Sequence, residues 1–357
     1  RRSVGGVSLR RSLPTASGRP LLCGDESEAA TGGRVVKCVY SAGRSEWCWS
    51  DAIFFADAAG AYEIRNLVGK GLGMVARRSL SAGERILCER PLATWTVGLA
   101  DGDTSANEAE EMVKSVVAAL TPAKRAAFFA LSQSERRYGA EKTAMGVWMS
   151  NAYPVHPANE EAAGTASAGV FRHICRINHS CTPNAHQEWN EELKRETVHC
   201  ISAVRAGEEL TLCYLGGPGR GYQRDSRQVT LMAKFGFLCG CSLCTLENGA
   251  LAESEERQLR LAAIAALLEA EPLPQDGDFV RLVTEKVLLL AREGLPECWT
   301  HVSMIEAMMR CRQLGNHRAA ALWASRATEC ARNAFGTDSS AFVLYNQLAV
   351  GLAARDP

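Results

Sequence analysis

The sequence lacks any run of 18 or more apolar residues, the length that a membrane-spanning helix requires. It also lacks a net charge, because its 40 basic side chains are balanced by 40 acidic ones. Without a global field there is no long-range attraction to nucleic acid or to an anionic membrane, so we expect neither as a partner. Any partner must therefore be recognised by a local site.

A disulfide framework is missing as well, although the sequence contains 14 cysteines. They are dispersed along the chain, and the one dense group, between Cys239 and Cys244, has the short spacing of a metal site. We therefore expect a reducing compartment, the cytoplasm or the nucleus. With 46% hydrophobic and 22% charged residues, a chain of 357 residues is expected to form a globular protein of two domains.

Acidic residues are absent from the first 24 positions, which hold five arginines together with serine, glycine and proline. Such a segment cannot bury enough apolar surface to fold, and we predict a disordered segment over residues 1–58. The same composition is typical of an organelle transit peptide, which is the alternative. Cys23, Cys38 and Cys48 are interpreted as ordinary thiols, since too few partners surround them for a second zinc module.

Between Ala61 and Thr245, short β-rich runs are broken by glycine, as in Gly69-Lys-Gly-Leu-Gly73. This Gly-x-Gly is not a dinucleotide-binding fingerprint, because no third glycine opens a helix. Gly71 and Gly73 lack a Cβ, which permits a ligand to approach closely or the backbone to take unusual φ values. A simple hairpin turn is the alternative interpretation.

Two parts of the chain have helical periodicity. Within residues 104–149, apolar residues recur at i, i+4, i+7 and i+8 from Met112, and Thr121 followed by proline is a typical helix start. In residues 247–357 the β signals stop, and successive apolar stripes predict a stack of antiparallel helices. Residues 314–320 hold a fragment of a tetratricopeptide-like pattern, although the full repeat signature is absent.

Three motifs in the middle of the chain occur together with the glycine-rich loop. They are Arg176-Ile-Asn-His-Ser-Cys-Thr-Pro-Asn184, Gly207-Glu-Glu-Leu-Thr-Leu-Cys-Tyr214 and Phe235-Gly-Phe-Leu-Cys-Gly-Cys-Ser-Leu-Cys244. In this combination the chain resembles the SET-domain protein methyltransferases, over residues 60 to 246. The compound pattern carries the resemblance, and no single motif would.

The resemblance implies an α+β fold, in which a SET β-clip core of short strands carries a helical insertion and a post-SET zinc site. The predicted SET domain covers residues 59–246, with the insertion at 104–149 and the post-SET motif at 235–246. Residues 247–357 are the predicted all-α, antiparallel, tetratricopeptide-like domain. Such a tail follows the SET core in the SET-and-MYND relatives, but the sequence contains no intact MYND zinc finger.

Zinc is the metal that the Cys-x-Cys-x-x-Cys motif predicts. The motif supplies three thiolates, and zinc prefers four ligands in a tetrahedron. In the family the fourth ligand is the cysteine of the Asn-His-Ser-Cys motif, while His186 and His199 are alternative ligands in this chain. Four thiolates leave no position for water, so the site would be structural, stapling the segment after Phe237 onto the core. The predicted ligands are Cys181, Cys239, Cys241 and Cys244.

The reaction that the resemblance implies is transfer of a methyl group from S-adenosylmethionine to a lysine amine of a protein. Tyr214 would line the lysine channel and orient the amine, and Phe237 would pack on the adenine of the donor. Arg176 and Glu208 are interpreted as structural ion-pair partners rather than catalysts. The predicted donor contacts are Lys70, Gly71, Leu72, Gly73, Asn151, Asn178, His179 and Phe237, and simple turn contacts are the alternative for Asn151.

The predicted partner is a protein, histone or non-histone, that presents a lysine, and the chain itself is expected to be a monomer. The alternative is a catalytically inactive SET and helical-repeat scaffold, against which the joint presence of Tyr214, Asn178 and His179 argues. Phe235 stands where many relatives have a tyrosine. The missing hydroxyl leaves the number of methyl groups added open.

Overall fold

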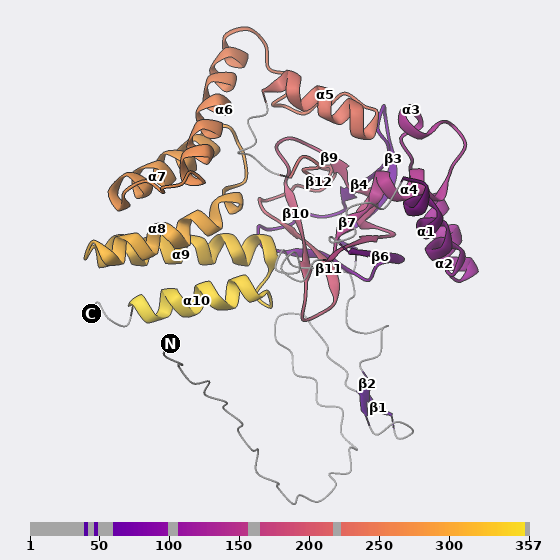
Figure 1. Ribbon diagram of the computed structural model, residues 1–357, viewed down its shortest axis with the longest axis horizontal. Coiled ribbons are helices and arrows are strands. Elements are labelled where there is room, and N and C mark those ends of the chain that lie inside the picture. Colours follow the sequence, from indigo (N-terminus) through magenta and orange to yellow (C-terminus); the bar gives the residue numbers. More distant parts are fainter. Residues whose placement is uncertain are drawn as a thin grey trace, which may run out of the picture. The chain divides into compact units, whose positions relative to one another are not determined.

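The computed structural model describes residues 39–41, 46–48, 60–98, 106–155, 165–216 and 223–353 (Figure 1). The predicted disordered segment 1–58, with Cys23 and Cys38, lies outside these residues apart from the antiparallel hairpin of β1 (Val39–Ser41) and β2 (Glu46–Cys48). Contacts between Cα atoms divide the chain into two compact units, Arg1–Phe54 and Phe55–Pro357. The second unit contains every other element described below.

The strands of the second unit are short and form several small sheets rather than one large sheet. Two sheets have two strands: β3 and β4 pair antiparallel, and β9 and β12 pair parallel. Two others have three strands, in the orders β10-β11-β5 and β6-β8-β7. The bounds are β3 (Tyr62–Leu67), β4 (Gly71–Ala76), β5 (Arg85–Glu89), β6 (Ala93–Gly98), β7 (Tyr153–Pro154), β8 (Thr165–Val170), β9 (Asn178–His179), β10 (Ala185–Asn190), β11 (Arg195–Cys200) and β12 (Thr211–Leu212).

One apolar core lies between these sheets. Its largest fully buried side chains include Met74 from β4, Ile86 from β5, and Phe171 and Ile177 from the segment between β8 and β9. Contributions from separate small sheets to one core explain why such short strands are stable, because each strand gains its stability from burial rather than from length. This core supports the segments that carry the sequence motifs.

The predicted insertion is helical in its described residues, and α1, α2 and α4 share an apolar cluster with β6 and β8, whereas α3 contacts α5. Thr121 accepts a hydrogen bond from the backbone of Lys124 and Pro122 occupies the first turn of α2, so the predicted helix start is confirmed. Val113, Phe128 and Trp148 are buried in the insertion's own apolar cluster. The bounds are α1 (Ala106–Ala118), α2 (Pro122–Ala130), α3 (Glu135–Tyr138) and α4 (Ala144–Asn151).

After the short 3₁₀ helix η2 (Ile174–Arg176) and the strands that follow it, α5 (Arg224–Phe235) leads the chain to the cysteine motif. Gly236, with a φ of +80°, ends α5 in a left-handed cap. The chain therefore turns sharply between Phe235 and Phe237, which directs both rings toward the region of Tyr214.

The C-terminal region is helical throughout its described residues, as predicted. Consecutive helices pack against one another, and α8, α9 and α10 lie side by side (Figure 1). The tetratricopeptide-like character and the division at residue 247 stay predictions. The bounds are α6 (Asn248–Leu268), α7 (Asp276–Arg292), η3 (Glu297–Thr300), α8 (His301–Gln313), α9 (His317–Phe335) and α10 (Ser340–Ala353).

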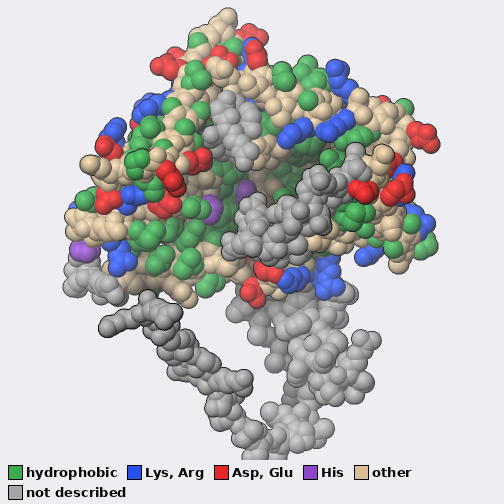
Figure 2. All heavy atoms as spheres, in the orientation of Figure 1, with side chains coloured by type: hydrophobic (Ala, Val, Ile, Leu, Met, Phe, Trp, Pro, Cys, Tyr) green, Lys and Arg blue, Asp and Glu red, His purple; other side chains and the backbone are tan. Residues whose placement is uncertain are grey.

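Helix α9 joins the helical region to the strands. The rings of Phe335 and His186 on β10 lie 5.4 Å apart in an edge-to-face arrangement, and Arg85 on β5 pairs with Asp338 just beyond α9. None of the described helices is long and apolar enough to cross a membrane. Charged side chains of both signs are scattered over the face shown in Figure 2, which is hollowed near its centre where hydrophobic side chains gather.

Candidate functional site

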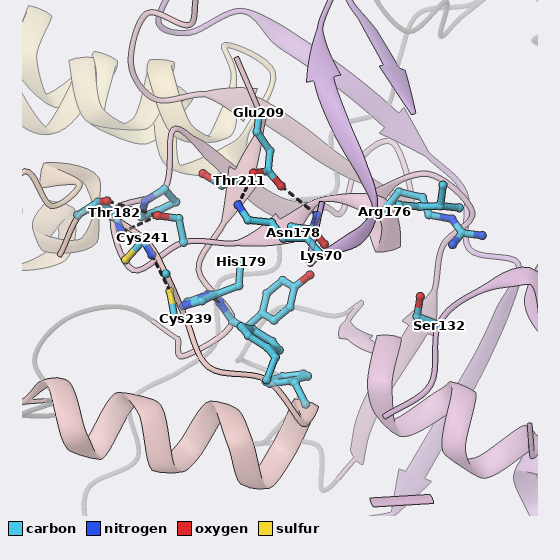
Figure 3. A pocket seen from close by; sticks show the side chains of 18 of the residues that line it. Lys70, Ser132, Arg176, Asn178, His179, Thr182, Glu209, Thr211, Cys239 and Cys241 are labelled. Carbon is cyan, nitrogen blue, oxygen red and sulfur yellow. Dashed lines mark hydrogen bonds and ion pairs between the residues drawn. The ribbon is translucent and has the colours of Figure 1, made fainter. Parts of the chain in front are cut away.

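The sequence motifs meet at one cavity of about 680 Å³ (Figure 3). Figure 3 places Ser132 and Arg176 at one end, Thr182 and Cys241 at the other, and Asn178 and His179 between them. Of the predicted site residues, the cavity is lined by Lys70, Leu72, Asn151, Asn178, His179, Tyr214, Phe237, Cys239 and Cys241, whereas Gly71, Gly73, Cys181 and Cys244 lie outside its lining.

The glycines of the β3–β4 loop have different structural roles. Gly71 has a φ of +71°, a conformation that side-chain-bearing residues rarely adopt, so it shapes the turn. Gly73 has ordinary backbone geometry, but a Cβ there would lie 2.4 Å from Leu67 Cδ1 and 2.7 Å from Asn178 Nδ2. The close approach that Gly73 permits is therefore to the Asn178 amide, and the structure does not bring Gly73 itself to the cavity.

The parallel pairing of β9 with β12 brings the first two motifs together. Thr211 pairs with Asn178 and Leu212 pairs with His179, which places Tyr214 just beyond the end of the ladder. The Tyr214 hydroxyl donates a hydrogen bond to the Ile177 carbonyl over 2.6 Å. Burial raises the pKa of this phenol above its usual value, so the hydroxyl stays protonated at neutral pH.

Two phenylalanine rings lie beside His179 and Tyr214. The centroid of Tyr214 lies 5.0 Å from that of Phe235 and 6.5 Å from that of Phe237, and the His179 and Phe237 centroids are 6.0 Å apart. Phe235 therefore touches the phenol ring while offering no hydroxyl. The apolar wall beside Tyr214 is built from the turn that follows α5.

Glu209 is a site residue that the sequence interpretation missed. Its carboxylate accepts hydrogen bonds from Lys70 Nζ at 2.5 Å and from Asn178 Nδ2 at 2.9 Å, so it joins two motifs across the cavity. Strand alternation was a usable signal, because Leu210 and Leu212 are fully buried and Glu209 faces the opposite side. The carboxylate fixes the amide of Asn178 and the tip of the glycine loop.

Arg176 and Glu208, interpreted as structural ion-pair partners rather than catalysts, form no ion pair with each other or with another charged side chain within the described part of the chain. Arg176 Nη2 donates to the carbonyl of Ala130 at 2.9 Å, and Glu208 accepts from the backbone N–H of Arg205 at 3.0 Å. Both side chains line the cavity. Each side chain therefore bonds a backbone group, and the partner of Arg176 is distant in sequence, so no spacing specifies it.

Asn151 is the last residue of α4 and not a loop residue. Its amide nitrogen donates to the carbonyls of Ser132 and Val147, each at 2.7 Å. These bonds tie α4 to the loop of residues 132–134, whose three members also line the cavity and were not predicted. Because this loop belongs to the insertion, only tertiary packing brings it to the site.

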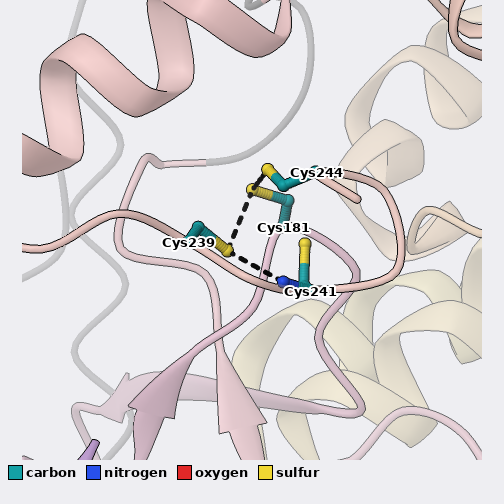
Figure 4. Close-up of side chains that lie close together, drawn as sticks. All are labelled: Cys181, Cys239, Cys241 and Cys244. Atoms are coloured by element: carbon teal, nitrogen blue, oxygen red, sulfur yellow. Dashed lines mark hydrogen bonds between the residues drawn. The ribbon is translucent and has the colours of Figure 1, made fainter. Parts of the chain in front are cut away.

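The four predicted metal ligands lie together (Figure 4). All four Sγ atoms are within 4.8 Å of one another, and Cys181 Sγ lies 3.6 Å from Cys244 Sγ and 4.0 Å from Cys239 Sγ. In a zinc tetrahedron with Zn–S bonds of about 2.3 Å, sulfur atoms are about 3.8 Å apart. The thiolate set and its spacing therefore fit zinc.

The histidines offered as alternative ligands are not part of this group, which among the described residues consists of cysteines alone. His199 accepts a hydrogen bond from Arg85 Nε at 3.0 Å, and burial lowers its pKa to about 3. His186 packs its ring on Phe335. Both side chains serve the junction between the strands and α9.

Comparison with known proteins finds a match in the part of the chain that carries this cavity. The family model described as "SET domain" matches residues 71–215. The Histone-lysine N-methyltransferase set5 of Schizosaccharomyces pombe is 26% identical over 283 residues, which cover 79% of this chain and 81% of that protein.

Two further relatives match over shorter stretches. The Histone-lysine N-methyltransferase ATXR4 of Arabidopsis thaliana is 37% identical over 89 residues, which cover 24% of this chain and 26% of that protein. The Protein-lysine N-trimethyltransferase SMYD5 of Homo sapiens is 30% identical over 93 residues, covering 26% of this chain and 22% of that protein. The chain thus spans most of the fission yeast relative and about a quarter of the other two. The match to the SET-domain model thus covers residues 71–215, and these relatives carry the names of lysine methyltransferases.

Proposed function

We propose that the protein transfers a methyl group from S-adenosylmethionine to a lysine side chain of a protein substrate. The observation that carries this proposal is that Tyr214, Asn178, Phe237 and Lys70, which come from four separate segments, line one cavity. When bound, the donor would supply an electrophilic methyl group on a positively charged sulfur. The remaining chemistry is the binding, orientation and desolvation that the chain's own residues provide.

Tyr214 is suited to orient an incoming amine. Its proton is committed to the Ile177 carbonyl, so the phenolic oxygen is left as an acceptor. An amine N–H of the substrate lysine would donate to this oxygen and thereby turn the nitrogen lone pair toward the methyl group. Holding two reacting atoms in line near 3 Å supplies a large part of a rate enhancement by orientation alone.

The amine must be neutral to react, although a free lysine has a pKa near 10.4 and its deprotonation at pH 7 costs about 4 to 5 kcal/mol. The walls beside Tyr214 are the rings of Phe235 and Phe237, which cannot solvate an ammonium group. Desolvation and the positive charge of the donor both favour the uncharged amine. We therefore assign no side-chain base, and water takes the proton.

At the donor end, polar groups gather around Glu209. Asn178 and Lys70, both held by this carboxylate, and the His179 region would bind the donor's polar groups. The ring of Phe237 would cover the adenine. Zinc on Cys181, Cys239, Cys241 and Cys244 would hold the segment that carries this ring and would take no part in the transfer.

The test measures methyl transfer from labelled S-adenosylmethionine to histones and to extract proteins, for the parent protein and for Tyr214→Phe. We expect the variant to bind the donor with unchanged affinity and to lose about 100-fold in kcat, because only the orienting oxygen is removed. Tyr345→Phe is the matched control, since this tyrosine lies in α10 and bonds His301. Its transfer rate should equal that of the parent.

The outcome against the proposal is equally definite. A parent protein that binds the donor but transfers no methyl group, with Tyr214→Phe indistinguishable from it, would favour the inactive scaffold. Mass spectrometry of the modified proteins then identifies the substrate class, histone or non-histone, and counts the methyl groups, which tests the consequence of Phe235.

A further inference from the structure

One imidazole contacts each part of the proposed machinery. His179 is 6% exposed, and its ring lies 5.3 Å from the ring of Tyr214 and 6.0 Å from that of Phe237. Its Nε2 atom is 3.3 Å from Cys181 Sγ, one of the four clustered thiols. The predicted catalytic residue, the predicted adenine-covering ring and a predicted metal ligand therefore share a single neighbour.

The Tyr214 backbone explains why a histidine is needed here. The β9–β12 ladder ends at Leu212, so the N–H of Tyr214 has no strand partner. It donates instead to His179 Nδ1 over 3.0 Å. A buried N–H without a partner is destabilising, so this side-chain bond fixes the backbone at Tyr214.

The same bond determines which ring nitrogen carries the proton. Because Nδ1 accepts from Tyr214, the neutral imidazole must carry its proton on Nε2. Nε2 therefore points an N–H at Cys181 Sγ. A metal-bound thiolate is a better acceptor than a neutral thiol, because it carries negative charge.

Resting on the proposed function, we propose that His179 is a positioning residue through which the four-cysteine centre controls Tyr214. The Cys181 thiolate orients the imidazole through Nε2–H, and Nδ1 in turn holds the Tyr214 amide, whose side chain receives the lysine. Metal occupancy thus affects the phenol through two hydrogen bonds, in addition to stabilising the post-SET segment.

Two substitutions separate the two bonds. His179→Asn places an amide oxygen where Nδ1 lies and can accept from Tyr214, but it does not reach Cys181. His179→Gln places an amide nitrogen where Nε2 lies and lacks the inner acceptor. His186→Asn is the matched control, because this histidine lies on β10 and packs on Phe335. All variants are made in the full zinc-loaded chain.

Three readouts are measured: the rate of zinc transfer to the chelator 4-(2-pyridylazo)resorcinol, the ¹⁵N–¹H resonance of the Tyr214 amide, and kcat with KM for the donor. His179→Asn should release zinc about tenfold faster and keep the Tyr214 resonance and kcat close to the parent values. His179→Gln should keep zinc, shift the Tyr214 resonance, and lower kcat about tenfold with little change in KM. The control should leave all three unchanged.

The ring-nitrogen ¹⁵N spectrum of the parent needs no variant and covers the case in which a variant does not fold. It should show a proton on Nε2 of His179, and chelation of zinc should move the Tyr214 amide resonance. A proton on Nδ1, or a Tyr214 resonance indifferent to zinc, would overturn the proposal, as would equal effects of both variants on every readout.

Failure of the proposed function gives a different pattern. Zinc release and the resonances do not depend on methyl transfer. A parent protein that transfers no methyl group but shows the expected tautomer and the expected split between variants would refute the activity and keep the coupling.

Discussion

The strand region holds the half-buried carboxylate of Glu209 and the helical tail the fully buried one of Glu293, and the two serve different purposes. Glu209 joins Lys70 and Asn178, which come from distant segments, and its side chain faces a cavity. Glu293 at the end of α7 has a fully buried side chain whose three donors all come from α6. A buried polar group is informative about function when its surroundings leave room for a ligand, and about stability when neighbouring protein groups enclose it.

The largest expected effect comes from removing a metal ligand. The loss should release the segment of Cys239, Cys241 and Cys244 from Cys181 in the strand region. Cys241→Ser leaves three thiolates, and we expect loss of stoichiometric zinc and of several kcal/mol of stability, because structural zinc binding is coupled to folding. Atomic emission gives the metal content and thermal unfolding gives the stability. Cys311→Ala is the control, a buried thiol of α8 outside the cluster. Stoichiometric zinc in Cys241→Ser would contradict the ligand set.

A stability effect without a direct functional effect is expected in the tail. Glu293→Ala removes the acceptor of two buried polar side chains and leaves Arg257 with only its longer ion pair to Glu253, and we expect a loss of about 3 kcal/mol in the free energy of unfolding, measured with urea. The control is Glu297→Ala, whose exposed ion pair with Arg326 should contribute less than about 1 kcal/mol. Equal effects of the two variants would remove the distinction between enclosed and exposed carboxylates.

The tail should contribute to acid sensitivity, in addition to the buried His199 of the strand region. Burial lowers the pKa of His301 from its usual 6.5 to about 4, with Glu188 opposing and His186 adding to the shift, and Tyr345 hydrogen-bonds its Nδ1. Since the unfolded chain binds a proton first, the contribution is complete above pH 6.5 and is lost as the pH falls toward 4. His301→Asn should flatten this loss by up to about 3 kcal/mol in unfolding curves at successive pH values. An unchanged pH slope would refute this source of acid sensitivity.

The smallest expected effect lies in the cavity. Glu209→Gln keeps the shape of the side chain but removes the charge that holds Lys70. We expect donor affinity to fall about fivefold, near 1 kcal/mol, with stability unchanged. Calorimetric titration with S-adenosylmethionine measures it. Glu63→Gln is the control, an exposed partner of Arg65 on β3. A large loss of stability in Glu209→Gln would place this carboxylate with Glu293 instead.

Much of the site was predictable because its residues occur in compact motifs. The spacing of Cys239, Cys241 and Cys244 indicated a metal site, the resemblance added Cys181, Tyr214 and Phe237, and the structure brings the four cysteines together as expected. Glu209 and Ser132 were missed. Their importance arises from partners in other segments, and no local pattern marks a side chain whose partner is distant in sequence.

The sequence alone indicated the resemblance to SET-domain proteins, the group of metal-binding cysteines and the change from strands to helices, because motif spacing and periodicity are local properties that one chain displays directly. Tertiary structure decided which neighbours these residues have. It placed Gly73 against the Asn178 amide and bonded Arg176 to a carbonyl of the insertion. It also placed the His179 imidazole between Cys181 and Tyr214. The physical reason is that hydrogen bonds and burial depend on distances in space, which are set only when separate segments pack around a common core.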